Sequence, residues 1–156
     1  MNNSLLEKAK LVRKWSLIAT SEAGSGHPTS CLSAADLMTV LFDNFYHYDL
    51  KNPKSIANDR LIFSKGHAAP LLYTLYTLAG AFSFDELKTL RKFHSRLEGH
   101  PTPEFPYAEA ATGSLGQGLS VGAGLAIGIK RENLLTKKPN VFVVLGDGEL
   151  AEGQVW

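Results

Sequence analysis

The chain has 156 residues, of which 44% are hydrophobic and 20% charged, and its formal net charge is +1. This length suits one domain with an ordinary core, and the balanced charge argues against a nucleic-acid partner. The lone Cys31 excludes an internal disulfide and fits a reducing compartment. The polar N-terminus is unlike a signal peptide, and the most apolar stretch, 115–129, is too short for a membrane span, so we expect a cytoplasmic protein.

Two helices are predicted before residue 50. The first runs to residue 20 from a capping box formed by Ser4 and Glu7. The second follows a loop over 21–31 and begins at Ser33, with Asp36 as its capping partner. The side chains expected to face the core are Leu11, Trp15, Ile18 and Ala19 in the first helix and Leu37, Val40, Leu41 and Phe45 in the second.

Two short apolar runs farther along, Leu61–Phe63 and Val141–Leu145, predict strands, and the second is typical of a strand buried on both faces. Three prolines predict a loop over 98–108. Helical patterns cover 68–79, 83–93 (capped by Ser83 with Glu86), 115–131 and 149–156, and a polar turn covers 133–139. Helices that interleave with short buried strands predict an α/β fold with a mainly parallel sheet.

Three of the five histidines follow a glycine: His27, His67 and His100. Since 14 of the 156 residues are glycine, chance would place fewer than one histidine in this context. Glycine lets the backbone approach a ligand, and imidazole donates, accepts or carries charge near neutral pH. Three separate turn histidines are the alternative, but the excess favours a shared site. His47 and His94 lack the preceding glycine, and we expect His94 at a helix end on the surface.

A glycine-rich segment, Gly113-Ser-Leu-Gly-Gln-Gly118, opens the helix predicted over 115–131. Its spacing matches neither the dinucleotide fingerprint nor a P-loop, yet glycines at a helix start still admit a ligand. Small residues also recur every four positions and predict a helix face for close packing; they are Gly116, Ser120, Gly124 and Gly128. We expect the first turn to meet a ligand and the later glycines to pack.

The strand predicted over 141–145 leads directly into Gly146-Asp147-Gly148. A carboxylate just past a buried parallel strand lies where α/β folds bind ligands. Oxygen ligands of this kind, completed by phosphate oxygens, suit Mg²⁺. The tripeptide alone is a common turn, but in this context it predicts a metal–diphosphate site.

Five motifs in this order resemble the transketolase family. They are Ser25-Gly-His-Pro28, Ser64-Lys-Gly-His-Ala68, Glu98-Gly-His-Pro101, Thr112-Gly-Ser-Leu-Gly-Gln-Gly-Leu-Ser120 and Gly146-Asp-Gly-Glu-Leu-Ala-Glu-Gly-Gln-Val-Trp156. The residues of these motifs are most similar to those of the separate N-terminal subunits of split transketolases, which have serine at the position of Ser114. The resemblance implies that residues 1–156 are the N-terminal part of a thiamine-diphosphate-binding domain, incomplete at its C-terminus.

The resemblance also implies a cofactor site for thiamine diphosphate and Mg²⁺, or Ca²⁺ in its place. Asp147 would be the metal ligand and Gly148 would meet the diphosphate. Gly113, Ser114 and Leu115 would bind the cofactor as well. Of these, Gly113 and Leu115 would contact the aminopyrimidine. His67 would touch the diphosphate side.

Catalytic roles follow from the same resemblance. His100 would lie beside the reactive thiazolium carbon and His27 beside the substrate carbonyl and hydroxyls, while Glu152 would lie at the subunit interface. The implied reaction transfers a two-carbon ketol unit between sugar phosphates, in the pentose phosphate pathway. The partners would be the remainder of the chain or a C-terminal subunit, with the completed enzyme a homo-oligomer, such as a dimer.

Three features depart from the family pattern. Thr29 stands where many relatives have glycine, the asparagine that shares the metal would lie beyond Trp156, and the second half of the enzyme is missing. We therefore expect the chain alone to be inactive. The alternatives are another thiamine-diphosphate enzyme, such as a deoxyxylulose-phosphate synthase, or a non-catalytic remnant.

Overall fold

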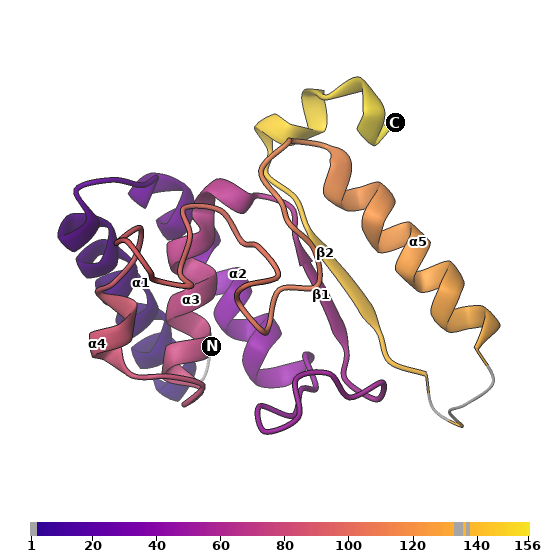
Figure 1. Ribbon diagram of the computed structural model, residues 1–156, viewed down its shortest axis with the longest axis horizontal. Coiled ribbons are helices and arrows are strands. Elements are labelled where there is room, and N and C mark those ends of the chain that lie inside the picture. The colour runs from indigo at the N-terminus through magenta and orange to yellow at the C-terminus, as the bar shows by residue number, and fades with distance from the viewer. Residues whose placement is uncertain (1–2, 133–135, 137) are drawn as a thin grey trace. The chain divides into compact units, whose positions relative to one another are not determined.

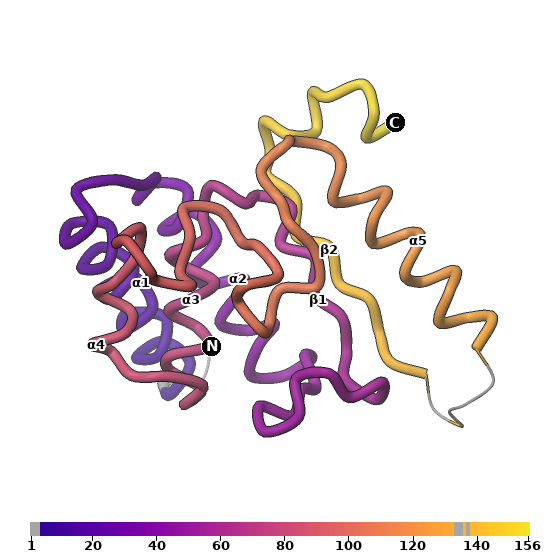
Figure 2. Tube along the Cα trace, viewed as in Figure 1, coloured from indigo at the N-terminus to yellow at the C-terminus, as the bar shows by residue number. Residues whose placement is uncertain are grey.

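The computed structural model describes residues 3–132, 136 and 138–156. The chain divides into two compact units, each of which is described by itself. The helical unit comprises the residues up to Tyr46 together with His67–His100, and the sheet unit comprises His47–Gly66 and Pro101–Trp156. Figure 2 shows the course of the backbone through both units.

Helix α3, Ala69–Leu78, forms the centre of the helical unit, and residues 69–77 are all buried. Helices α1, Asn3–Ala23, and α2, Pro28–Asn44, pack against each other and against α3 (Figure 1). Just past the end of α2, the hydroxyl oxygen of the buried Tyr46 lies 3.1 Å from that of Tyr76 in α3. This packing continues through the single turn η1, Gly66–Ala68, which leads into α3.

Both predicted starts of these helices are wrong. Helix α1 already includes Asn3, so Ser4 is not its N-cap, and α2 begins at Pro28 rather than at Ser33. Proline at the first position of a helix has its φ preset and lacks only a hydrogen that the first turn leaves unbonded, so it starts the helix ahead of the serine.

The predicted core faces of α1 and α2 also need correction. Leu11 is 42% exposed and Leu37 is 62% exposed, although both were expected to face inward. Most of the buried positions are small side chains, among them Ala9, Ser16 and Ala19 in α1 and Cys31, Ala34 and Ala35 in α2, and the larger Val12 and Met38 are buried beside them. Small residues let neighbouring helices approach closely, and this close packing decides which face turns inward.

The predicted cap at Ser83 is confirmed, since its hydroxyl accepts a hydrogen bond from the amide of Glu86 at 3.1 Å. The helix that follows, α4, is only Phe84–Leu87 and does not continue to residue 93. Two later residues, Arg91 and His94, adopt positive φ angles of 59° and 65°. Left-handed backbone cannot continue a right-handed helix, so the chain turns instead.

The sheet unit is built on two parallel strands, β1, Arg60–Phe63, and β2, Val141–Val144. Helix α5, Gln117–Arg131, lies along this pair (Figure 1). The predicted α/β class with a parallel sheet is thereby confirmed. Strand β2 is half-buried at all four positions rather than buried on both faces, since β1 is the only strand that pairs with it among the described residues.

Two further differences concern the ends of the sheet unit. The helix predicted over 149–156 is replaced by two 3₁₀ turns, η2, Gly148–Ala151, and η3, Gly153–Val155. The polar turn predicted over 133–139 lies largely outside the described residues.

Glycines of α5 do determine how closely this helix packs on the sheet, although they are not the glycines that the sequence predicted. An added Cβ at Gly122 would lie 2.2 Å from Cγ2 of Val143 in β2, and one at Gly118 would lie 2.2 Å from the hydroxyl of Ser64. In contrast, nothing lies within 4 Å of such an atom at Gly124 or Gly128. The close-packed face of α5 therefore carries Gly118 and Gly122.

A carboxylate holds each end of the strand pair. At the amino end, Asp59 accepts hydrogen bonds from the amides of Asn140, at 2.6 Å, and His47, at 2.9 Å. At the carboxyl end, Glu149 is only 2% exposed. It accepts from the amide of Gly116 at 2.8 Å, from the amide of Gly146 at 2.9 Å, and from the hydroxyl of Ser64. These bonds join the two strand ends to the start of α5.

Replacing Gly122 with alanine is expected to lower the free energy of unfolding by about 1–3 kcal/mol, because the new methyl group overpacks against β2. The matched variant, Gly128→Ala, places its methyl group in open space and is expected to be neutral or stabilising by up to about 1 kcal/mol. Urea unfolding followed by circular dichroism measures both. Equal midpoints for the two variants would contradict the packing described here.

Replacing Glu149 with alanine leaves three buried donors without their acceptor, at roughly 1–3 kcal/mol each. We expect a loss of about 3 kcal/mol or more in unfolding free energy, and a smaller loss for Glu149→Gln, which keeps the shape. The control is Glu152→Gln, at an exposed residue, with an expected change within about 0.5 kcal/mol. An unfolding midpoint for Glu149→Ala that matches the control would show that the carboxylate is dispensable.

Candidate functional site

Three loops of the sheet unit meet at the carboxyl end of the strand pair. Ser64–Gly66 follows β1, Gly146–Gly148 follows β2, and Gly113–Gly116 precedes α5, and Glu149 is bonded to one residue of each. The first and third loops are in close contact, since a Cβ at Gly66 would lie 2.7 Å from the backbone of Thr112. The carboxyl edge of a parallel sheet is where α/β folds bind ligands.

The loop before α5 has a backbone that only glycine adopts without strain. Gly116 has a φ of 84° and forms the N-cap of α5. The amide of Gln154 donates a hydrogen bond to the carbonyl of Leu115, and an added Cβ at Gly116 would lie 3.0 Å from Cβ of Glu152. The structure therefore brings the residues around Gly113–Leu115 next to the turns that carry Glu152.

Asp147 lies at the end of β2, as the N-cap of η2, and is exposed. Gly148, which follows it, is also exposed, with nothing within 4 Å of the place where a Cβ would be. The described residues contain no group of three or more histidine, cysteine, aspartate or glutamate side chains that could hold a metal ion. A single accessible carboxylate fits a hard cation that takes its other oxygen ligands from a bound phosphate group or water.

Two of the glycine-linked histidines are in contact within the helical unit. The rings of His27 and His67 have centroids 5.3 Å apart and pack edge to face. His27 is the N-cap of α2, and it follows Gly26, whose φ of 132° few side chains tolerate. An added Cβ at Gly26 would also lie 2.8 Å from Thr20, so glycine is required where the backbone turns into α2.

The third histidine, His100, is half-buried in the same unit. Burial lowers the pKa of its imidazole below the usual value, and the nearby charges of Arg91 and His27 lower this pKa further. A lowered pKa keeps the ring neutral at physiological pH, so that one nitrogen is free to accept a proton or a hydrogen bond.

The two other histidines have different surroundings. The ring of His47 lies 3.2 Å from the carboxylate of Asp59, at the amino end of the sheet. His94 is exposed and packs beside the ring of Phe93, in a left-handed turn rather than at the predicted helix end.

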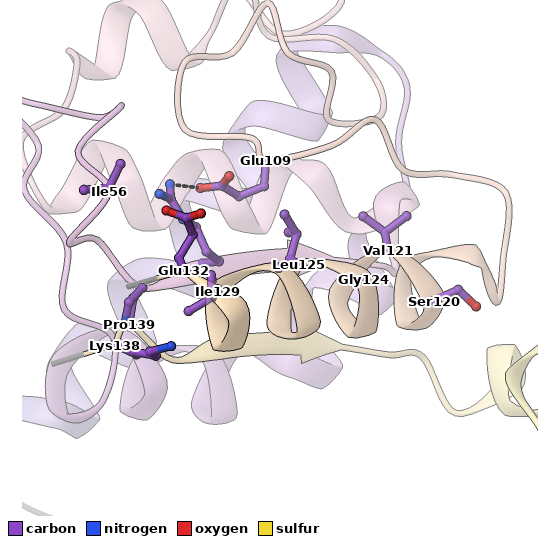
Figure 3. Close-up of a pocket in the computed structure, with 12 residues that line it drawn as sticks. Ile56, Glu109, Ser120, Val121, Gly124, Leu125, Ile129, Glu132, Lys138 and Pro139 are labelled. Carbon is purple, nitrogen blue, oxygen red and sulfur yellow. Dashed lines mark hydrogen bonds and ion pairs between the residues drawn. The ribbon is translucent and has the colours of Figure 1, made fainter. Parts of the chain in front are cut away.

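The sheet unit also contains an open cavity of about 580 Å³ beside α5, next to the segments that carry Ile56 and Glu109 (Figure 3). Its wall includes Val121 and Leu125 of α5 and the ion pair between Arg60 and Glu109, whose atoms are 3.0 Å apart. Among the described residues, the lining includes none of the three loops at the carboxyl end of the strands. We therefore place the candidate site at those loops and not in this cavity.

Sequence reasoning missed two residues that the structure brings to these sites. The motif over 146–156 gives Glu149 no role of its own, although its position directly after a Gly-Asp-Gly turn allows its side chain to fold back on the strand end. Arg91 had no signal in the sequence, because its position depends on a left-handed turn and on contacts within the helical unit.

A family model described as "Transketolase, thiamine diphosphate binding domain" matches residues 6–155. The transketolase of Pongo abelii is 48% identical over 153 residues, which cover 98% of this chain and 24% of that protein. The chain therefore spans about a quarter of the length of this relative.

Solved structures give the same result. A transketolase from Leishmania mexicana matches with a TM-score of 0.89 and 31% identity, over 97% of this chain and 24% of that one. The transketolase of Campylobacter jejuni matches with a TM-score of 0.88 and 37% identity, over 99% of this chain and 25% of that one.

No helix in the described part of the chain has the length and apolar character needed to cross a membrane. The match to the family model over residues 6–155, together with the identity to known transketolases over nearly the whole chain, shows that the chain belongs to the transketolase family and carries its thiamine diphosphate binding domain.

Proposed function

We propose that this chain binds thiamine diphosphate and Mg²⁺ as part of a transketolase, which transfers a two-carbon ketol unit from a ketose phosphate to an aldose phosphate. The observation that carries the proposal is the exposed Asp147-Gly148 turn at the carboxyl end of β2. Membership of the family supports the reaction class.

In the sheet unit, Asp147 is proposed to give one carboxylate oxygen to the metal ion. Gly148 leaves open space for a diphosphate group, and the metal ion would offset that group's charge. Gly113 and Leu115 are proposed to line the aminopyrimidine side, and Ser114 is proposed to bind the cofactor beside them, at the left-handed start of α5.

In the helical unit, His67 is proposed to contact the diphosphate, His100 the thiazolium end of the cofactor, and His27 the hydroxyls of the sugar. When bound, the cofactor would supply a carbon nucleophile for the carbonyl group of the ketose. A neutral His100, as favoured by its lowered pKa, accepts a proton from a sugar hydroxyl, and the His27–His67 contact fixes the orientation of both rings.

The chain spans 24% of the length of a curated relative, so the proposed activity includes polypeptide outside it. We propose that this polypeptide, as the remainder of the chain or as a second subunit, completes the site, with Glu152 at the interface of a homo-oligomer. Residues 1–156 would then form one part of the cofactor-binding domain. The cytoplasmic location remains a prediction from the lone cysteine.

Replacing Asp147 with alanine in the completed enzyme is expected to weaken Mg²⁺-dependent binding of thiamine diphosphate by more than about 100-fold, since even residues that only support metal ligands contribute 10–100-fold. The control, His94→Ala, changes an exposed residue outside the proposed site and should leave the affinity unchanged. Calorimetric titration of the cofactor measures both variants. Equal affinities would remove Asp147 from the metal site.

The chain alone is expected to show no transketolase turnover, because a single carboxylate from the chain leaves the metal and substrate sites incomplete. Activity should appear when the remaining polypeptide is supplied. A coupled assay with a ketose phosphate donor, an aldose phosphate acceptor, Mg²⁺ and thiamine diphosphate measures this difference. Clear turnover by the purified 156-residue chain would refute the expectation.

A further inference from the structure

The turn that follows α4 returns Arg91 toward the segment that carries His100. The φ of Arg91 is 59°, in the left-handed region that residues other than glycine rarely adopt. Its amide donates a hydrogen bond to the carbonyl of Leu97 at 2.9 Å. This bond closes a loop and brings the start of the turn beside residues 98–100.

The Arg91 guanidinium occupies the place where a side chain at position 99 would stand. An added Cβ at Gly99 would lie 2.2 Å from both Cζ and Nη2 of Arg91 and 2.5 Å from Nε. Gly99 is not among the glycines with positive φ, so its backbone conformation does not require glycine. The guanidinium lies against the Gly99 backbone, and a side chain at this position would displace it.

The same guanidinium also affects the pKa values of the ionisable groups around this contact. The positive charge of Arg91 contributes, after burial, to the lowered pKa of His100. Burial raises the pKa of Tyr73 in α3, with Glu98 raising it further and Arg91 lowering it. The hydroxyl of Tyr73 donates to the carbonyl of Glu98 at 3.0 Å. The charge of Arg91 therefore acts on ionisable groups on both sides of Gly99.

Other titratable groups reach His100 from the neighbouring elements. His27, at the start of α2, acts on His100 by its charge, and its ring packs against His67 of η1. Tyr73 faces the turn from α3, and Glu98 belongs to the turn itself. The charges of Arg91 and His27 act on the pKa of His100 in the same direction, and Glu98 is exposed, so solvent screens its carboxylate.

We propose that Arg91 is a positioning residue for His100, and that glycine at position 99 leaves room for the guanidinium to pack directly on its backbone. The guanidinium then fixes the turn and presents its positive charge to the imidazole. The significance of this contact for catalysis rests on the proposed function, in which His100 faces the cofactor. The contact itself does not.

The test compares Arg91→Ala, Gly99→Ala and the double variant by NMR titration of the histidine ring protons. The signal of His100 is assigned by its loss in His100→Gln. Arg91→Ala should raise the pKa of His100, because a nearby positive charge is removed. Gly99→Ala should raise it too, because the new methyl group displaces the guanidinium. The double variant should match Arg91→Ala alone, since the methyl group then has nothing to displace.

Two further variants separate this proposal from simpler explanations. Lys92→Ala removes the same charge one residue away, at an exposed position, and should leave the pKa of His100 unchanged. Arg91→Lys keeps the charge without the flat group and should give an intermediate shift. Both also keep the comparison informative if Arg91→Ala lowers the melting temperature too far for titration.

An unchanged pKa of His100 in Arg91→Ala would overturn the proposal. A shift of this pKa in Lys92→Ala equal to that in Arg91→Ala would overturn it too. Additive shifts in the double variant would refute the direct contact with Gly99. None of these titrations contains thiamine diphosphate, so a failure to bind the cofactor would reject the proposed function and leave this inference standing, and the reverse also holds.

Discussion

The buried carboxylate of Glu149 is the interaction on which the sheet unit depends. It draws Ser64, Gly116 and Gly146 to one point, although they belong to three separate segments of the chain. Burying a charge is costly unless donors surround it, and here two backbone amides and a hydroxyl do so. A side chain with no proposed contact to any ligand therefore determines where the loop bearing Asp147 lies relative to the start of α5.

The remaining constraints of the sheet unit are contacts that tolerate no side chain. Gly66 lies against Thr112, and Gly118 lies against Ser64, so the loops that Glu149 joins are also in direct van der Waals contact. The helical unit uses the same device at Gly26, while Gly99 leaves room for the Arg91 guanidinium, and each of these two glycines precedes a histidine. In both units these glycines allow close packing of the backbone. Because the loops then lack side chains at these positions, a ligand can also approach their backbone.

The sequence predicted the features that depend on local patterns and failed where tertiary packing decides. The strands, the loop over 98–108 and the cap at Ser83 follow from apolar runs, prolines and hydrogen-bonding side chains close in sequence. The inward faces of α1 and α2 were predicted from the largest apolar residues, whereas the buried positions are mostly small residues that allow close helix packing. The proximity of His27 and His67 was suggested by a repeated dipeptide, but no local pattern could show that Arg91 turns back on Gly99.

The pairing of β1 with β2 has a consequence for how the chain folds as it is synthesised. The bond between Ser64 and Glu149 joins residues 85 positions apart, and β2 is the only strand paired with β1 among the described residues. Closing so long a loop is slow, because its entropy is lost before any contact compensates. We therefore expect helices α1, α2 and α3 to assemble while Leu61, Ile62 and Phe63 are not yet paired with β2. This interval is when the nascent chain is most exposed to aggregation and to chaperones.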